Sequence, residues 1–482
     1  MRNNGCPPCG ARFVVNPFEL FHPAGQSRHN AALRPVTGHS VNPRQTFSPL
    51  RPSACPGLLR VVQALDGGIC RIKLGGGSIR ADQAVAVADA AARYAGGVIE
   101  ATNRANLQIR GIGEQAAALI ESLLAAGLGP TTAAGDDVRN LMLSPSAGID
   151  RHMLIDSRPL AGQILDSLQT RARFHDLSAK FAVQLDGGEA LAMLEHPHDV
   201  WLSAVEQNGE SLLAFGLAGC PVDEPLGAVP EALGHELVIK VLELFLDLAR
   251  PDQTRMRHLL AELPVSDFMA QLVQRLSQPP VDVTGWDRSA SSIALHIGTY
   301  PQRQNGLVYI GAGVPLGRLD SAMLRGVSQL AGAYGDGSLR FTPWQSLLVP
   351  GVQFKDAPAV TDALNRLGFI CSADQSLAHV IACTGSTGCA KGLADTKDDA
   401  LQLAALLPHH GQRLSVHLSG CSRSCAAAHV APVTLLAISP GHYDLYFRDA
   451  GQPGFGALHA RNLTIEAVAA LLDARSRSPL DA

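Results

Sequence analysis

The chain has 482 residues, of which 46% are hydrophobic and 17% charged, with 47 glycines and 30 prolines. This composition is typical of a globular protein with several domains or repeats, and it excludes a disordered or fibrous chain. The formal net charge of −4 provides no cationic field for nucleic acid or anionic membranes, and no apolar run reaches the ~18–20 residues of a membrane span, so we expect a cytoplasmic protein without either partner.

Residues 1–54 are predicted to be a poorly ordered extension. Glu19 is the single acidic residue among the first 50 residues, and hydrophobic side chains show no sustained period there. Cys6 and Cys9 have CxxC spacing, but a lone pair of thiols cannot close a metal site. An arginine-containing, acid-poor leader also resembles an organelle transit peptide, although nothing else in the sequence supports that interpretation.

An internal repeat follows the extension. Residues 77–112 align with residues 317–352 at a constant offset of 240 and without a gap, and eight of the 36 positions are identical, including Gly77/Gly317, Tyr94/Tyr334 and Gly97/Gly337. The first copy predicts a strand over 68–74, a turn over 75–77, a helix over 81–95, a turn over 96–97 and a strand over 98–109. A mixed α/β stretch follows each copy, so the order is A-B-A′-B′ and the two half-units are expected to pack as one pseudo-twofold α+β domain.

The strand expected over 98–109 and the residue after it carry polar side chains at every second position. Side chains alternate between the two faces of a strand, so one face is expected to hold Arg104, Asn106, Gln108 and Arg110. Guanidinium groups bind carboxylates through paired hydrogen bonds, which favours an anionic ligand. The equivalent positions of the second copy are Trp344, Ser346, Leu348 and Pro350. Because the fold tolerates the loss of both arginines, we interpret them as one asymmetric binding site, with a solvated strand face as the alternative.

Two more clusters of polar residues lie in otherwise apolar segments after the first copy of the repeat. Arg139 and Asn140 lie between Val138 and Leu141, and Lys180 precedes a strand expected over 181–185. The chain has only six lysines, so a lysine directly before a strand is an unusual feature of this sequence. Lys180 alone does not indicate a binding site.

Four of the ten cysteines fall near the C-terminus. Cys383 and Cys389 form a C-x5-C loop after a strand expected over 377–382, and Cys421 and Cys425 form a C-x3-C loop after a strand expected over 414–418. The sulfurs of the second pair would face one way if a helical turn opens there. Glycines in both loops let backbone N–H groups approach sulfide, so four thiolates of this kind suit a [4Fe–4S] cluster. A structural zinc site is the alternative, although zinc sites favour shorter spacings.

These features together resemble the sulfite/nitrite reductase superfamily. The resemblance rests on the A-B-A′-B′ repeat, the C-x5-C and C-x3-C loops and the Thr-Asn-Arg…Gln…Gly segment at 102–111, and it covers roughly residues 55–475. It implies a ferredoxin-like pseudo-twofold domain with two α/β domains that hold a tetrapyrrole beside the cluster. It also implies that Arg104, Arg139 and Lys180 face the tetrapyrrole and substrate as catalytic and binding residues, and that Cys425 is the cysteine that bridges cluster and siroheme in the reductases.

Within the superfamily the sequence is most similar to the precorrin-3B synthase family. The reductases carry a second lysine two residues after the first, where this chain has Ala182, and the opening Cys55-Pro56-Gly57-Leu58 and the segments Ser144–Asp150 and Asp186-Gly187-Gly188 match the cobalamin-pathway family better. The resemblance implies an oxygen-dependent monooxygenase that hydroxylates the anionic tetrapyrrole precorrin-3A and forms a γ-lactone, with electrons from NADH. No NADH fingerprint is visible, so we expect a separate reductase as the direct electron donor.

The resulting hypothesis divides the chain into an extension (1–54), ferredoxin-like halves (55–122 and 289–360) and two α/β domains (123–288 and 361–482), the last of which carries the cluster. A mononuclear iron for oxygen activation would need further ligands, and the candidates are His409, His410, His417 and His429, each of which is more often an ordinary histidine. A siroheme-dependent sulfite or nitrite reductase and a non-catalytic iron–sulfur electron carrier are the alternatives.

Overall fold

A computed structural model describes residues 55–288, 294–407, 414–449, 452 and 454–477, all within one compact unit, Val41–Ala482. Two parts of the sequence prediction lie outside the described residues: the extension 1–54 with Cys6 and Cys9, and the candidate ligands His409 and His410. The described residues form four five-stranded sheets flanked by helices, which confirms the predicted α+β class.

Two of the sheets form the central domain, and each takes one strand from the other copy of the repeat. The first has the order β1 (Val62–Ala64), β2 (Gly67–Ile72), β5 (Leu107–Ile112), β4 (Val98–Ala101) and β13 (Arg318–Asp320). The second has the order β11 (Gly298–Pro301), β12 (Leu307–Gly313), β15 (Ser346–Gln353), β14 (Ser338–Phe341) and β3 (Ser78–Arg80). Because β13 pairs with β4 and β3 pairs with β14, neither copy completes its sheet alone.

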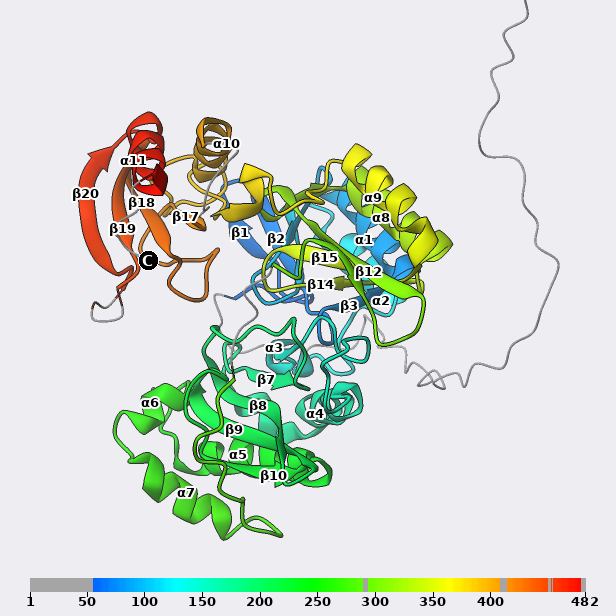
Figure 1. Cartoon of the computed structure of the whole chain (residues 1–482), viewed down its shortest axis with the longest axis vertical. Coiled ribbons are helices and arrows are strands. Elements are labelled where there is room, and N and C mark those ends of the chain that lie inside the picture. The colour runs from blue at the N-terminus through cyan, green and yellow to red at the C-terminus, as the bar shows by residue number, and fades with distance from the viewer. Residues whose placement is uncertain (1–54, 289–293, 408–413, 450–451, 453, 478–482) are drawn as a thin grey trace, which may run out of the picture. The chain divides into compact units, whose positions relative to one another are not determined.

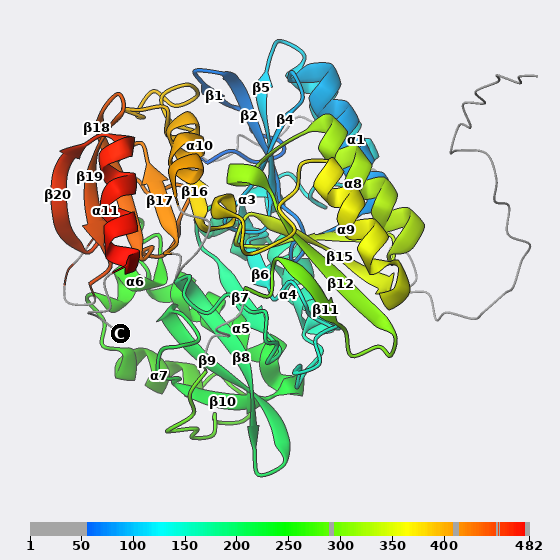
Figure 2. The same cartoon turned by 45° about the horizontal axis from the view of Figure 1, so that its top comes forward.

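The helices of the central domain repeat at the same offset. They are α1 (Ala81–Tyr94), α2 (Ala116–Ala125), α8 (Ser321–Tyr334) and α9 (Ala357–Arg366). Helices α1 and α8 differ by 240 residues at both ends and lie side by side (Figures 1 and 2). Alanine and valine at helical spacing, such as Ala84, Val87, Ala88 and Ala91, face a core shared by both copies. The repeat predicted from the sequence is therefore confirmed as a structural repeat.

The single strand expected over 98–109 is wrong. The chain forms a hairpin in which β4 and β5 are antiparallel neighbours, with Ile99 opposite Ile109. The turn between them closes because Ala105 takes a left-handed φ of 54° and the Thr102 hydroxyl accepts hydrogen bonds from the N–H groups of Arg104 and Asn106. Arg104 therefore lies in a turn, and only Gln108 and Arg110 of the predicted polar face lie on a strand.

The other two sheets share one topology. The earlier sheet has the order β6 (Leu141–Leu143), β7 (Val183–Asp186), β8 (His198–Gln207), β9 (Glu210–Gly219) and β10 (Gly227–Pro230), and the later one has the order β16 (Val380–Ala382), β17 (Val416–Ser419), β18 (Val433–Ser439), β19 (His442–Phe447) and β20 (Ala457–Leu463). In each sheet the first three strands are parallel and the last two run antiparallel to their neighbours. The repeat therefore extends to the α/β parts of the chain.

Amphipathic helices cover these two sheets. The earlier part has α3 (Gly135–Val138), α4 (Arg158–Thr170), α5 (Gly234–Leu248), α6 (Met256–Leu260) and α7 (Val265–Val273), and the later part has α10 (Thr396–Leu406) and α11 (Ile465–Arg477). Short 3-10 turns complete the described elements: η1 (Ala172–Asp176), η2 (Glu231–Leu233), η3 (Pro315–Gly317), η4 (Phe354–Asp356) and η5 (Ser376–His379). Among the described helices, none combines the length and the apolar character that crossing a membrane requires.

Candidate functional site

The turn between β4 and β5 places Arg104 beside the C-x3-C loop. Asn103, from the same turn, donates a hydrogen bond from Nδ2 to the carbonyl oxygen of Cys425 at 3.3 Å. Residues more than 300 positions apart in the chain are thus in direct contact. The sequence predicted this neighbourhood only through the family resemblance, because no local pattern connects the two segments.

Three guanidinium groups gather at this turn and form what we call the arginine cluster: Arg71 of β2, Arg104, and Arg255 just before α6. Burial lowers the pKa of Arg104, and the positive charges of Arg255 and Arg71 lower it further. Arg255 Nε lies 2.9 Å from both carboxylate oxygens of Asp199, whereas Arg71 donates to the uncharged Oε1 of Gln108 at 2.7 Å.

The arginine cluster carries more positive charge than its protein partners neutralise. Within the described ranges, the side chain of Arg104 has no hydrogen-bond acceptor or ion-pair partner, and Asp199 is shared with Arg255. A desolvated guanidinium group without a partner is unfavourable, and carboxylates satisfy it through paired charge-assisted hydrogen bonds. The arrangement therefore favours an anionic ligand at Arg104, next to Cys425.

The sequence-based prediction missed two members of the arginine cluster, Arg71 and Arg255. It also missed Lys73, a buried lysine beside the cluster. The Lys73 ammonium donates to the carbonyl oxygen of Asp137 at 2.7 Å, and burial lowers the pKa of Lys73 to about 7. Alternation along the strand expected over 68–74 could have placed Arg71 and Lys73 on one face. Arg255 gave no such signal, because its position depends on the packing of α6 against β8 and β9.

The remaining predicted binding residues have structural partners or lie at the surface. Arg139 donates to the carbonyl oxygens of Leu128 and Gly129 at 3.3 Å each and pairs with Asp136 at 3.6 Å. Lys180 is exposed in the turn before β7, and its ammonium group has no acceptor in the described part of the chain. Asn106 accepts the N–H of Leu74 through Oδ1 at 2.8 Å, so it shapes the turn while Gln108 orients Arg71.

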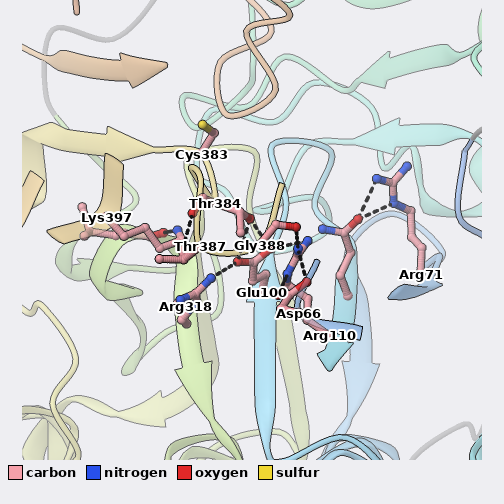
Figure 3. A network of polar contacts seen from close by, with 12 residues as sticks. Asp66, Arg71, Glu100, Arg110, Arg318, Cys383, Thr384, Thr387, Gly388 and Lys397 are labelled. Atoms are coloured by element: carbon pink, nitrogen blue, oxygen red, sulfur yellow. Dashed lines mark hydrogen bonds and ion pairs between the residues drawn. The ribbon is translucent and has the colours of Figure 1, made fainter. Parts of the chain in front are cut away.

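Arg110 belongs to a different group of charges, in which it is paired with carboxylates (Figure 3). Its guanidinium donates to both carboxylate oxygens of Asp66 at 2.8 and 2.9 Å and lies 3.7 Å from the carboxylate of Glu100. Arg318, from the second copy of the repeat, pairs with the same Glu100 at 2.8 Å. Burial raises the pKa of Glu100, but the charges of Lys397, Arg110 and Arg318 outweigh burial and the pKa is lowered overall.

This charge network holds the loop that carries Cys383 and Cys389. Arg110 donates to the carbonyl oxygen of Gly388 at 3.2 Å, and the Thr384 hydroxyl donates to Glu100 at 3.3 Å. Lys397 donates to the carbonyl oxygen just before Cys383, that of Ala382, at 3.2 Å. Arg110 thus anchors the cysteine loop to the central domain, as Figure 3 shows, and does not join the arginine cluster.

The four cysteines come from two loops at one edge of a sheet. Strands β16 and β17 are parallel, with Ala382 opposite Leu418, so Cys383 and Cys421 follow neighbouring carboxyl ends. The N–H of Gly420 donates to Cys383 Sγ at 3.2 Å. Gly385 requires its lack of a side chain, because its φ is 71° and a Cβ there would lie 2.6 Å from the backbone nitrogen of Thr396.

No helical turn opens at Cys421–Cys425, where the chain forms an irregular turn with a left-handed φ of 51° at Ser424, so the condition under which both sulfurs would face one way is not met. Cys425 is exposed. Among the described residues, no group of three or more His, Cys, Asp or Glu side chains converges closely enough to hold a metal ion. The thiols therefore fit an iron–sulfur cluster in donor chemistry and in the sheet edge they share. Burial and then the nearby Cys383, Cys421 and Cys389 raise the pKa of Cys425.

Of the described histidine candidates, His417 is buried and His429 is half-buried, and burial lowers the pKa of both. His417 lies on β17, where burial and then the charge of His429 lower its pKa to about 4. His429 packs its ring against His196 at 5.0 Å between centroids and approaches Glu195 at 3.8 Å. Neither histidine belongs to a metal-binding group within the residues that the structure describes.

Comparison with known proteins agrees with this architecture. The nitrite/sulfite reductase ferredoxin-like half domain matches residues 63–127 and 300–367, and the nitrite and sulphite reductase 4Fe-4S domain matches residues 134–280. The first match covers both copies of the repeat, and the second covers the earlier α/β part. The four cysteines lie outside both matches.

Individual relatives fall into two groups. A chloroplastic ferredoxin–nitrite reductase of Zea mays is 30% identical over 394 residues, which are 75% of this chain and 68% of that protein. A precorrin-3B synthase of a Sinorhizobium species is 27% identical over 411 residues, which are 85% of this chain and 84% of that protein. The solved structure of the Mycobacterium tuberculosis NirA protein superposes with a TM-score of 0.73 at 21% identity, covering 86% of this chain and 82% of that one, and so shares the fold.

The chain belongs to the nitrite/sulfite reductase superfamily, a family of oxidoreductases. Its relatives include both nitrite reductases and a precorrin-3B synthase. The chain spans 68% of the maize reductase and 65% of its spinach counterpart, but most of the Sinorhizobium protein.

Proposed function

We propose that this protein is an oxygen-dependent monooxygenase of the precorrin-3B synthase type, which converts precorrin-3A to precorrin-3B in cobalamin biosynthesis. The observation that carries the proposal is the arginine cluster, where the half-buried Arg104 has no side-chain acceptor among the described residues and its neighbour Asn103 contacts the Cys425 loop. A precorrin has many acetate and propionate carboxylates, which are the partners that this excess of guanidinium charge requires.

Two observations favour the monooxygenase over a reductase. The Sinorhizobium precorrin-3B synthase matches over 84% of its length, whereas the maize reductase has a third of its length unmatched. The position of the reductases' second lysine is Ala182 in this chain, and Ala182 is buried with its N–H donating to Asp199 at 2.9 Å. Reduction of sulfite or nitrite consumes several protons and needs positioned donors, and this position provides none.

In the proposed reaction, the arginine cluster binds the carboxylates of the substrate and orients the macrocycle toward the Cys425 loop. Cys383, Cys389, Cys421 and Cys425 would hold a [4Fe–4S] cluster, which would supply one-electron transfer from an external reductase that oxidises NADH. One atom of O₂ enters the substrate and the other leaves as water, so each turnover takes two electrons. Lys73 supplies further positive charge, and the network around Glu100 holds the loop of Cys383 in place.

A siroheme-dependent nitrite or sulfite reductase is the second candidate. Ferredoxin–nitrite reductases of plants and cyanobacteria are prominent among the relatives, with identities from 27% to 30%, and siroheme is also a polycarboxylate that the arginine cluster could bind. In that case Cys425 would bridge cluster and siroheme, as the resemblance implies.

The two candidate functions predict different visible absorbance spectra and different reactions. We would purify the protein anaerobically, record its visible spectrum, and measure iron and acid-labile sulfide. Broad iron–sulfur absorbance with O₂-dependent consumption of precorrin-3A would support the monooxygenase. A sharp siroheme band together with reduction of nitrite or sulfite would replace it by the reductase, and a protein with neither iron nor sulfide would refute both.

A further inference from the structure

A cavity of about 440 Å³ lies on the side of the molecule formed by the second copy of the repeat. Its wall comes from residues 190–196 after β7, 294–297 before β11, 343–345 between β14 and β15, and parts of 373–381 and 415–432. Asn103 of the β4–β5 turn and Arg448 complete it. Most wall residues are apolar. The rings of Trp344 and His296 lie nearly parallel in this wall, with an interplanar angle of 12° and 5.0 Å between centroids.

The cavity corresponds, through the internal repeat, to the predicted anion site. The offset of 240 relates Arg104 to Trp344. Matching the start of β6 to that of β16 relates Arg139 to Ala378, and matching β7 to β17 relates Ala182 to Ser415. Trp344, Ala378 and Ser415 all line the cavity. The second copy therefore has a hollow at the equivalent place, with an indole and small side chains where the first copy has guanidinium groups.

The wall also contains buried polar atoms that lack partners. Among the described residues, His196 Nδ1, His429 Nδ1 and Gln345 Oε1 are shielded from solvent and form no hydrogen bond. Such atoms are unfavourable unless a ligand or an ordered water satisfies them. The residues that carry them line a volume within the range of small-molecule sites.

The charge of this cavity differs from that of the arginine cluster. Burial lowers the pKa of His196 well below its ordinary value and that of His296 to about 4, so both rings are neutral near pH 7 and can each donate and accept one hydrogen bond. The exposed Arg448 pairs with Glu195 at 2.9 Å, which neutralises the two charged residues in the wall. The wall therefore has no unpaired charge of its own, although the charge of Arg104 acts on His196.

We propose that this cavity is a second binding site, for an uncharged, planar aromatic heterocycle that stacks on Trp344 and hydrogen-bonds to His196 and His429. The aromatic wall selects a flat ring by stacking, and the unpartnered ring nitrogens select a compound with donors and acceptors on its edge. The site goes beyond the proposed monooxygenase, because its ligand would contact Trp344, His196 and His429 and not the guanidinium groups or the thiols. Its wall nevertheless reaches the neighbours of both, through Asn103 and through Ala426 and Ala427.

The test uses lumichrome, an uncharged tricyclic heterocycle, and the full-length protein. We expect saturable binding of one lumichrome per chain by equilibrium dialysis, with quenching of tryptophan fluorescence. Trp344→Ala should weaken binding at least fivefold, whereas Trp344→Phe, which keeps a flat ring, should retain most of it. Trp286→Phe is the control, since Trp286 packs in a separate apolar cluster and should not change the affinity.

Uroporphyrin, an anionic tetrapyrrole, separates this site from the proposed substrate site. Its binding should depend on Arg104 and not on Trp344, and lumichrome binding should show the opposite dependence. Absence of saturable lumichrome binding, equal binding by folded Trp344→Ala, or equal binding of the non-aromatic adamantanol would overturn the proposal. Failure of uroporphyrin alone would count against the proposed function and leave the second site intact.

Discussion

Replacing Glu100 by glutamine tests whether the buried charge network stabilises the fold. The Glu100 side chain is 9% exposed and lies 2.8 Å from Arg318 and 3.7 Å from Arg110. At an effective dielectric constant of ~20, Coulomb's law gives gross attractions of about 6 and about 4.5 kcal/mol for these contacts. Much of this offsets desolvation, so removing the carboxylate charge should cost ~3–5 kcal/mol, the usual cost of leaving buried partners uncompensated.

Urea denaturation followed by circular dichroism measures this loss. Glu262→Gln is the matched control, because Glu262 pairs with Arg250 at similar distances but at the surface, and its midpoint should not change measurably. The pKa of Glu100 is lowered in the folded state, so its contribution is present above the unfolded pKa near 4.5 and is lost as the pH falls through the folded value. If Glu100→Gln and Glu262→Gln unfold at the same urea concentration as the parent protein, the network does not stabilise the fold as argued.

Three further predictions concern the site. Burial lowers the pKa of Lys73 from 10.5 to about 7, so its ammonium group is charged below that pH and neutral above it. Uroporphyrin binding should therefore weaken as the pH rises from 6 to 8. Lys73→Met should flatten this pH profile, whereas Lys355→Met, at an exposed position, should not. Cys383→Ser should abolish bound iron and acid-labile sulfide, with Cys371→Ser as control, and retained iron would remove Cys383 from the ligand set. Arg104→Ala should weaken uroporphyrin binding about tenfold or more without changing the urea midpoint by much, and unchanged binding by dialysis would contradict the anion site.

The predicted binding residues show where local patterns fail. Arg104 and Arg110 are six positions apart in one polar alternation, yet the turn at Ala105 sends Arg104 toward Cys425 and leaves Arg110 to pair with Asp66 and Glu100. Alternation describes a strand only while the backbone stays extended. The left-handed residue Ala105 ends the alternation, so Arg104 is separated from Gln108 and Arg110, which stay on β5.

By itself the sequence determined the repeat, the fold class and the two cysteine loops. Glycines at turns, apolar periods and cysteine spacings are all visible in a single sequence without knowledge of which distant residues pack together. It did not determine that β3 and β13 exchange between the two halves, or that Arg255 joins Arg71 and Arg104. The cavity beside Trp344 was equally invisible. These features join residues distant in the chain, and only packing in three dimensions decides which charges are neutralised and which stay available to a ligand.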